Sequence, residues 1–360
     1  MTQFTKTTFR IGKKQLGLLE VLTNTNGVSG NEQAIREIIR NHVRSYADEI
    51  KTDAMGNLLV YKHAAHSPPL KVMIAAHMDE IGFMIVNEEG EGLYAFEAVG
   101  GIDERQLQAK CVSVGNTMIP GTISSVPIHL KTEDEHHSSP STRSMRIDIG
   151  PTNKGKIKVG DYAAFATKFF RCGDSIFAKA LDNRLGVATL IELIKRVPDH
   201  IEFLAAFTVQ EEIGLRGARV AAYEFNPDLA IVVDSTPAFD LPRPDGRENT
   251  QYNCCLDAGP AIYLSDAGTL SDPRLIRFLT RIARENGIPF QYRQPGGGGT
   301  DAGAIHKTRS GIPSISVSIP GRYAHTPVML ARKKDWENTV LLLEKTLETI
   351  SPAVLVEDRT

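Results

Sequence analysis

The sequence predicts an α/β fold in which helices flank a mostly parallel central sheet and a small β-barrel-like segment is inserted. Three features of the chain indicate this fold: apolar runs typical of buried strands, amphipathic stretches between them, and a β-rich segment in the middle of the chain. At 360 residues, of which 41% are hydrophobic, the chain is long enough to bury a large core.

Helices are predicted where apolar residues recur on one face of a 3.6-residue turn. From Ile35 to Val43, isoleucine and valine occupy positions i, i+3, i+4 and i+8, and either Ser29 or Asn31 stands where a cap residue would begin a helix. A second helix is predicted from residue 183 to about residue 197. Helices that alternate with strands favour parallel strands joined by helical crossovers.

Strands are predicted at four apolar runs, residues 72–76, 203–209, 229–233 and 315–319. Between them, the chain changes to short alternating stretches separated by Gly, Pro and Asn, as in small antiparallel barrels. We therefore expect an α/β domain formed by residues 1–80 and 171–360, and an inserted β-rich domain formed by residues 81–170. The polar, Ser-rich stretch 133–144 is predicted to be an exposed loop.

Composition and charge exclude several classes of partner. The formal net charge is −2, and Lys and Arg are spread along the chain, so we expect neither nucleic acid nor a membrane surface as a partner. No apolar run is long enough to cross a membrane, and the N-terminus lacks the apolar core of a signal peptide. Four cysteines at irregular spacing indicate neither a disulfide framework nor a cysteine-type zinc site. We expect a cytoplasmic protein.

Side chains that bind metals follow several of the predicted strands. The carboxyl ends of parallel strands meet at one edge of the sheet, so residues far apart in the chain are expected to converge there. The residues at these strand ends are His77, Asp79, Glu211, Glu212, Asp234 and His325. Asp182 precedes a predicted helix, where a carboxylate is also a natural N-cap.

These residue types indicate the chemistry of the site. Histidines and carboxylates without cysteine suit zinc, cobalt or manganese. Two ions need one carboxylate between them and a His and a carboxylate on each side. The residues that supply this set are His77, His325, Asp182, Glu212 and Asp234. Glu211 remains as a base beside a metal-activated water, which is what hydrolysis requires.

Each residue also has a simpler interpretation. An acidic residue at a strand end is commonly a cap or a solvated turn residue, and His77 could donate to a backbone carbonyl. The glycine run 296–299 is either a loop that lets the backbone approach a substrate or a mobile loop, and it lacks the context of a phosphate-binding loop. The joint placement of the acidic residues and histidines at strand ends favours a metal site.

Seven motifs give the chain its resemblance to a known family. They are SGNEQAIRE (29–37), AAHMDEIGFMI (75–85), KALDNRLG (179–186), TVQEEIGLRGA (208–218), VVDSTPA (232–238), GGGTDAGAIH (297–306) and IPGRYAHTP (319–327). In order and spacing the chain resembles the M42 family of metallo-aminopeptidases, the glutamyl and leucyl aminopeptidases that build tetrahedral dodecamers. The resemblance spans nearly the whole chain.

The resemblance implies a role for each site residue. His77 and Asp234 complete opposite metal positions, and Asp182 bridges them. Glu212 and His325 supply the remaining ligands.

Glu211 is implied as the general base, and Asp79 is implied to hold the ring of His77 in place. The Gly298–Gly299 backbone contacts the substrate. Asn183 stands where many members of the family carry a second Asp, and Gly321 stands where Thr or Ser is commoner.

The resemblance also implies the fold, the partners and the activity. The fold is a catalytic α/β domain with an inserted barrel-like dimerisation domain, whose dimers assemble into a dodecamer. We expect an aminopeptidase with two divalent ions per subunit, zinc or cobalt and as a third option manganese. Its substrates are peptides with a free N-terminus. The sequence leaves the preferred N-terminal residue open.

Three alternatives stay open at this point. A two-metal deacylase or carboxypeptidase-like hydrolase needs the same ions and differs only in pocket shape. An endoglucanase-type glycosidase needs two carboxylates but gives the histidines no purpose. An inactive assembly protein is disfavoured because every expected ligand and the base are present.

Overall fold

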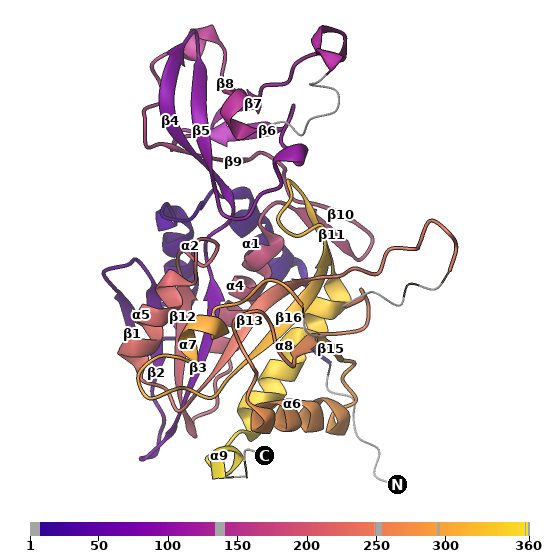
Figure 1. Cartoon of the computed structure of the whole chain (residues 1–360). Coiled ribbons are helices and arrows are strands. Elements are labelled where there is room, and N and C mark those ends of the chain that lie inside the picture. Colours follow the sequence, from indigo (N-terminus) through magenta and orange to yellow (C-terminus); the bar gives the residue numbers. More distant parts are fainter. Residues whose placement is uncertain are drawn as a thin grey trace.

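The computed structural model describes residues 8–133, 141–247, 249, 254–293, 296–356 and 358. Most of the predicted loop 133–144 lies outside these residues. Figure 1 shows a large α/β body with a separate small β unit above it.

The large body is built on an eleven-stranded sheet. In spatial order its main path contains β1 (Glu49–Thr52), β2 (Leu58–Lys62), β12 (Ile201–Thr208), β3 (Leu70–His77), β13 (Leu229–Pro237), β16 (Ser314–Arg322), β17 (Met329–Arg332), β11 (Ser175–Ala178) and β10 (Phe170–Cys172). Off this path, β14 (Ala261–Tyr263) pairs with β16 and with β15 (Gln291–Arg293). The central strands β12, β3, β13 and β16 are mutually parallel, and the strands outside them on this path pair antiparallel.

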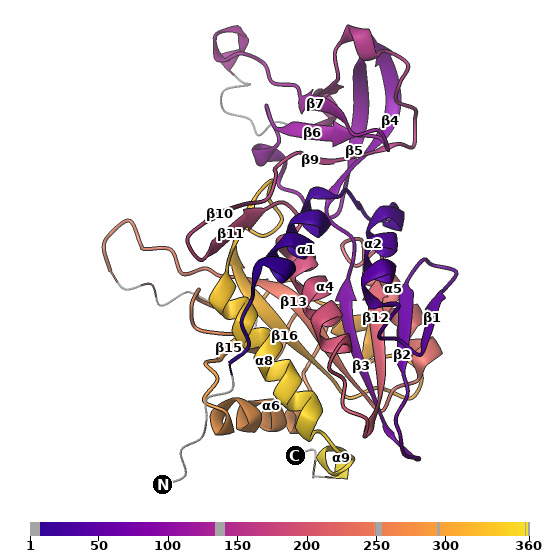
Figure 2. The same cartoon turned by 180° about the vertical axis from the view of Figure 1, so that it is seen from behind.

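Helices cover both faces of this sheet. They are α1 (Lys13–Asn24), α2 (Gln33–Val43), α4 (Leu181–Ile194), α5 (Arg216–Phe225), α6 (Pro273–Glu285), α7 (Ala302–Ile305), α8 (Lys333–Thr349) and α9 (Ala353–Val356). Val72 and Ile74 of β3 pack in the core under α1, α4 and α8, whereas Met73 and Ala75 pack in the core under α5 and α7 (Figures 1 and 2). The central strands are apolar on both faces because both faces are covered.

The small unit is a closed barrel with the strand order β4-β5-β8-β7-β6-β9. The strands are β4 (Gly82–Gly90), β5 (Leu93–Val99), β6 (Cys111–Val114), β7 (Ile119–Ile123), β8 (Ile147–Asp148) and β9 (Tyr162–Phe165). Short 3₁₀ turns lie at Glu104–Gln106, Ile128–Leu130, Thr142–Ser144 and Pro151–Asn153. Phe83 lies at the centre of its core, edge-on to Phe96 and Phe165 with ring centroids 5.1 and 5.3 Å away. The predicted fold class, a central sheet with flanking helices and an inserted barrel, is confirmed.

The predicted cap of the first helix is wrong. Helix α2 begins after Glu32 without a side-chain cap, and the Ser29 hydroxyl instead donates to Asp79 Oδ2 at 2.5 Å. At the start of α4, Asp182 and Asn183 have non-helical backbone angles, and Asn183 Oδ1 accepts from the Gly186 N–H at 3.0 Å. Asn183 thus caps α4, and the simpler interpretation of Asp182 as the cap does not apply, so its carboxylate is available to other groups. Among the described residues, no helix combines the length and apolar character needed to cross a membrane.

Candidate active site and metal centre

The predicted site residues meet at the carboxyl ends of the central strands. His77 is the last residue of β3, Glu211 and Glu212 follow β12, and Asp234 lies in the second half of β13. His325 is the third residue after the end of β16. These four strands are neighbours in the sheet and run in one direction, so their ends bring the side chains together.

His77 forms one half of the cluster. Its Nε2 lies 3.4 Å from Asp182 Oδ1 and 3.5 Å from Asp234 Oδ1, and its side chain is 2% exposed. Its Nδ1 faces the Asp79 carbonyl oxygen at 3.2 Å and the Asp79 carboxylate at 3.4 Å. Both of these groups only accept hydrogen bonds, so Nδ1 carries a ring proton, and Nε2, directed toward the two aspartates, is the ring nitrogen that a metal ion would bind.

His325 forms the other half. Its Nε2 lies 3.4 Å from Glu212 Oε2 and 3.7 Å from Asp182 Oδ2. Its Nδ1 donates to the Gly101 carbonyl oxygen at 2.9 Å, so the same ring nitrogen carries a proton as in His77. Gly101 follows β5, so a segment that begins in the barrel orients a histidine at the edge of the large sheet.

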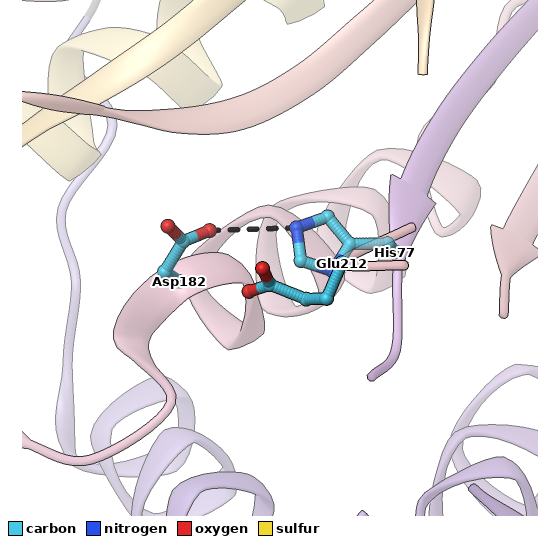
Figure 3. A group of neighbouring side chains, drawn as sticks. All are labelled: His77, Asp182 and Glu212. Carbon is cyan, nitrogen blue, oxygen red and sulfur yellow. Dashed lines mark ion pairs between the residues drawn. The ribbon is translucent and has the colours of Figure 1, made fainter. Parts of the chain in front are cut away.

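Asp182 lies between the two halves, with one carboxylate oxygen toward each histidine. Figure 3 shows Asp182 and Glu212 approaching His77, and the ligand atoms of these three residues all lie within 4.8 Å of one another. The family resemblance placed His77 and Asp234 at opposite ions, whereas the structure places them on the same side of Asp182. The physical reason is that β3 and β13 are adjacent parallel strands.

The charges of the site fit divalent cations. Within the described part of the chain, none of Asp182, Glu211, Glu212 and Asp234 forms an ion pair with Lys or Arg. Burial raises the pKa of Glu212 to about 8 and raises that of Asp234 above its usual range. For Glu211 the same burial, together with the neighbouring carboxylates, raises the pKa well above its usual range. A largely buried group of acidic side chains that no Lys or Arg neutralises is stabilised by bound metal ions.

The histidines respond to this excess of acid. Burial opposes the charged form of His77, but the carboxylates of Glu211, Asp182 and Asp234 raise its pKa well above its usual range. Burial alone would raise the pKa of Asp182, but the two histidines lower it instead. The donor set of two imidazoles and several carboxylates, all without cysteine, suits zinc, cobalt or manganese.

A cleft of about 110 Å³ opens beside this cluster. Its wall includes His77, Asp182, Glu211, Asp234 and His325 together with the backbone of Gly297–Gly299. A Cβ atom added at any of these three glycines would meet nothing within 4 Å, so the fold itself does not fill the space beside them. This space borders the candidate metal ligands.

Two side chains hold the glycine loop in place, and the sequence did not identify either of them. Arg293, 4% exposed, donates to the Gly297 carbonyl oxygen at 2.7 Å and stacks over the Tyr263 ring. Asp301, 1% exposed, accepts from the Thr208 hydroxyl at 2.5 Å, and burial raises its pKa to about 7. Asp301 lies within the motif GGGTDAGAIH quoted above, and an acidic residue two positions after four glycines is the sequence signal that could have identified it.

Comparisons with known proteins show the family of this chain. A family model described as M42 glutamyl aminopeptidase matches residues 56–342. The chain belongs to the M42 aminopeptidase family. It is 39% identical over 331 residues to a predicted aminopeptidase of Acetivibrio thermocellus, covering 91% of this chain and 96% of that protein. The chain is thus a peptidase, a hydrolase of peptide bonds.

Solved structures of M42 relatives have the same fold. The aminopeptidase APDkam598 of Desulfurococcus kamchatkensis superposes with a TM-score of 0.89 at 32% identity, covering 95% of this chain and 96% of that one. The TET1 peptidase of Pyrococcus horikoshii superposes with a TM-score of 0.80 at 33% identity, covering 92% of this chain and 98% of that one. The latter is described as assembling into a tetrahedron or a large octahedral shell.

Proposed function

We propose that this M42 peptidase is a two-metal aminopeptidase that removes the N-terminal residue from peptides. The observation that carries the proposal is the position of Asp182, whose two carboxylate oxygens each face a different histidine. Each histidine has a further carboxylate beside it, Asp234 next to His77 and Glu212 next to His325. This is the donor arrangement that two ions sharing one bridging ligand require.

The proposal assigns the ligands in two groups. His77, Asp182 and Asp234 would hold one ion, and Asp182, Glu212 and His325 would hold the other. Two divalent ions bound there polarise the peptide carbonyl and lower the pKa of water. Zinc and cobalt are the proposed metals, with manganese as the third option.

The remaining side chains transfer a proton or orient a metal ligand. Glu211 lines the cleft, belongs to neither group of ligands, and is the proposed general base that takes a proton from water and returns it to the leaving amine. Asp79 orients His77 through its Nδ1 and is buried with 0% exposure. The Gly298 and Gly299 backbone borders the cleft and is the proposed contact for the substrate.

The barrel is the proposed dimerisation unit. The proposed domain division is 1–80 and 171–360 for catalysis and 81–170 for association, and the barrel strands β4–β9 fall within the second range. A homo-oligomer, built from dimers into a dodecamer, is supported by the related TET1 peptidase and its large assemblies. We further propose that the enzyme acts in the cytoplasm.

A substrate panel tests the activity. Aminoacyl-anilides with free and with acetylated amines are incubated with the protein as purified, after chelation, and after addition of zinc or cobalt. The expected result is hydrolysis of the free-amine compounds only, lost on chelation and restored by metal. Hydrolysis of acetylated compounds alone would support a deacylase, and no hydrolysis with any metal would contradict the proposal.

A further inference from the structure

The turn that carries Glu211 is held from outside by side chains. Four successive backbone N–H groups, those of residues 209–212, each donate to a buried side-chain oxygen. In chain order the acceptors are Asn57 Oδ1 at 3.0 Å, Glu32 Oε1 at 3.2 Å, Asp79 Oδ1 at 3.0 Å and Asp79 Oδ2 at 3.2 Å. Strand β12 has ended at Thr208, so the strand ladder no longer fixes the backbone here.

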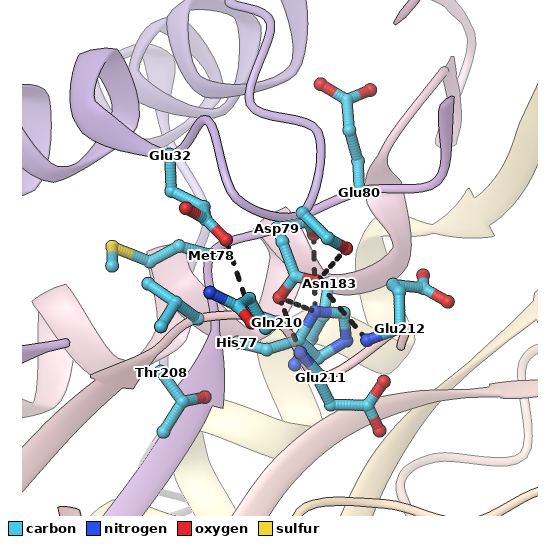
Figure 4. A network of polar contacts seen from close by, with 12 residues as sticks. Glu32, His77, Met78, Asp79, Glu80, Asn183, Thr208, Gln210, Glu211 and Glu212 are labelled. Carbon is cyan, nitrogen blue, oxygen red and sulfur yellow. Dashed lines mark hydrogen bonds and ion pairs between the residues drawn. The ribbon is translucent and has the colours of Figure 1, made fainter. Parts of the chain in front are cut away.

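Gln210 is the unusual residue in this turn. Its φ angle is +56°, in the left-handed region that residues with a Cβ atom rarely adopt. Its N–H donates to Glu32 Oε1, which also accepts from the Gly30 N–H at 2.7 Å. Glu32 is 4% exposed and immediately precedes α2, so it is itself held in a rigid position. Figure 4 shows Glu32 reaching Gln210 from one side while Asp79 reaches Glu211 and Glu212 from the other.

We propose that Glu32 is a positioning residue that aims the proposed base Glu211 by holding Gln210 in its left-handed conformation. The inference rests on the proposed function, because it requires Glu211 to be the base. Gln210 is the residue directly before Glu211, so a rotation of its backbone would swing the Glu211 side chain away from the cleft. Glu32 itself is not among the residues that line the cleft.

Glu32 is the acceptor whose role can be separated from the others. Asp79 also contacts Nδ1 of His77, so its removal would disturb a proposed metal ligand as well as the turn. Asn57 binds the Gly217 carbonyl oxygen at 2.9 Å and braces the far end of the turn. The Glu32 carboxylate accepts from two backbone N–H groups, those of Gly30 and Gln210, and from none of the proposed metal ligands.

The test compares two substitutions of Glu32 in the metal-loaded enzyme. Glu32→Ala removes the acceptor and is expected to lower kcat by about 10–100-fold, with KM and the metal content little changed. Glu32→Gln keeps an amide oxygen that can accept both N–H groups and is expected to restore most of kcat. Glu37→Ala, a change of a half-exposed glutamate on α2, is the matched control and should leave kcat unchanged.

The Gln210→Gly background tests whether Glu32 acts by holding residue 210 in the left-handed conformation. Glycine adopts positive φ without a steric penalty, so Gln210→Gly makes the turn depend less on Glu32. The loss of kcat caused by Glu32→Ala is therefore expected to be several-fold smaller in the Gln210→Gly background than in the wild type. A role of Glu32 in general stability would give the same loss in both backgrounds.

Three results would overturn the inference. They are an unchanged kcat in Glu32→Ala, an equal loss in Glu32→Gln and Glu32→Ala, and an equal effect of Glu32→Ala in both backgrounds. Each of these results can be interpreted only if the wild-type enzyme hydrolyses free-amine anilides and the Glu211→Gln variant does not. If the wild type is inactive, or Glu211→Gln is active, the proposed function fails, and that failure is visible without any Glu32 variant.

Discussion

Glu80→Gln is expected to destabilise the protein strongly because Glu80 neutralises two buried cations. Its carboxylate, 2% exposed, contacts Lys179 Nζ at 2.7 and 2.8 Å and Arg184 Nη2 at 3.3 Å, and it accepts from the Gly27 N–H at 2.9 Å. The side chains of Lys179 and Arg184 are 3% and 0% exposed. These two cations flank Asp182 in the chain, so the cluster also supports the start of α4 beside the candidate metal site.

The magnitude follows from this burial. Removing one partner of a buried ion pair costs about 3–5 kcal/mol of unfolding free energy. Lys179 limits its own part of this cost because it can release its proton, whereas Arg184 cannot. Burial already lowers the pKa of Lys179 to about 8 although Glu80 is beside it, and without that carboxylate the pKa falls further.

The pH dependence has a definite sign. Above the folded-state pKa of Lys179, the unfolded chain binds more protons than the folded protein, so stability rises with pH. In Glu80→Gln the folded-state pKa of Lys179 is lower, so the increase of stability with pH begins at a lower pH than in the wild type. The difference in unfolding free energy between the two proteins is therefore expected to narrow by about 1 kcal/mol between about pH 7 and about pH 9.

The assay is urea unfolding of the metal-loaded protein at one protein concentration, followed by tryptophan fluorescence. Trp336 is the single tryptophan of the chain, and it is fully buried with its Nε1 donating to Thr189 of α4 at 2.9 Å. Glu285→Gln, which removes the exposed partner of Arg281, is the control and should change stability by less than about 0.5 kcal/mol. The reasoning is refuted if Glu80→Gln costs no more than this control, or if its cost is equal at both pH values.

Three further predictions concern the site itself. Glu211→Gln should lower turnover by about 10²–10⁴-fold while metal analysis finds both ions retained, and near-normal turnover would exclude Glu211 as the base. Asp182→Asn should lose metal in the same analysis, because both halves of the cluster share Asp182, and full occupancy would show that it does not bridge. Zinc binding to chelated protein at neutral pH should release protons, because burial raises the pKa of Glu212 to about 8 and the ligand must be ionised. Calorimetry in buffers of different ionisation enthalpy measures this proton release, which should decrease above about pH 8. A binding heat that is the same in every buffer would contradict the prediction.

Most of the site could be predicted because its residues stand at recognisable places in the chain. His77 ends a strand in which residues 72–76 are all apolar, and Glu211 and Glu212 follow a second strand with the apolar run 203–207. The pattern of a buried strand is local, and parallel strands bring their carboxyl ends to one edge whatever their spatial order. The convergence of these residues was therefore predictable without knowing which strands are neighbours.

Which carboxylate lies beside which histidine could not be predicted in this way. It depends on the order of the strands, and β3 lies between β12 and β13 in space although it precedes both in the chain. This order places His77 beside Asp234. The cap of α4 likewise could not be read from the sequence, because the choice between Asp182 and Asn183 depends on backbone angles that residue type does not specify.

The sequence by itself determined the fold class, the residue types of the site and its family. Only the tertiary structure decided which groups orient those residues: Glu32 and Asp79 on the turn of Glu211, and Gly101 on His325. These contacts join residues 178, 132 and 224 positions apart in the chain. Local periodicity carries no information over such separations, so hydrogen-bond partners of this kind are fixed only when the sheet and the barrel have assembled.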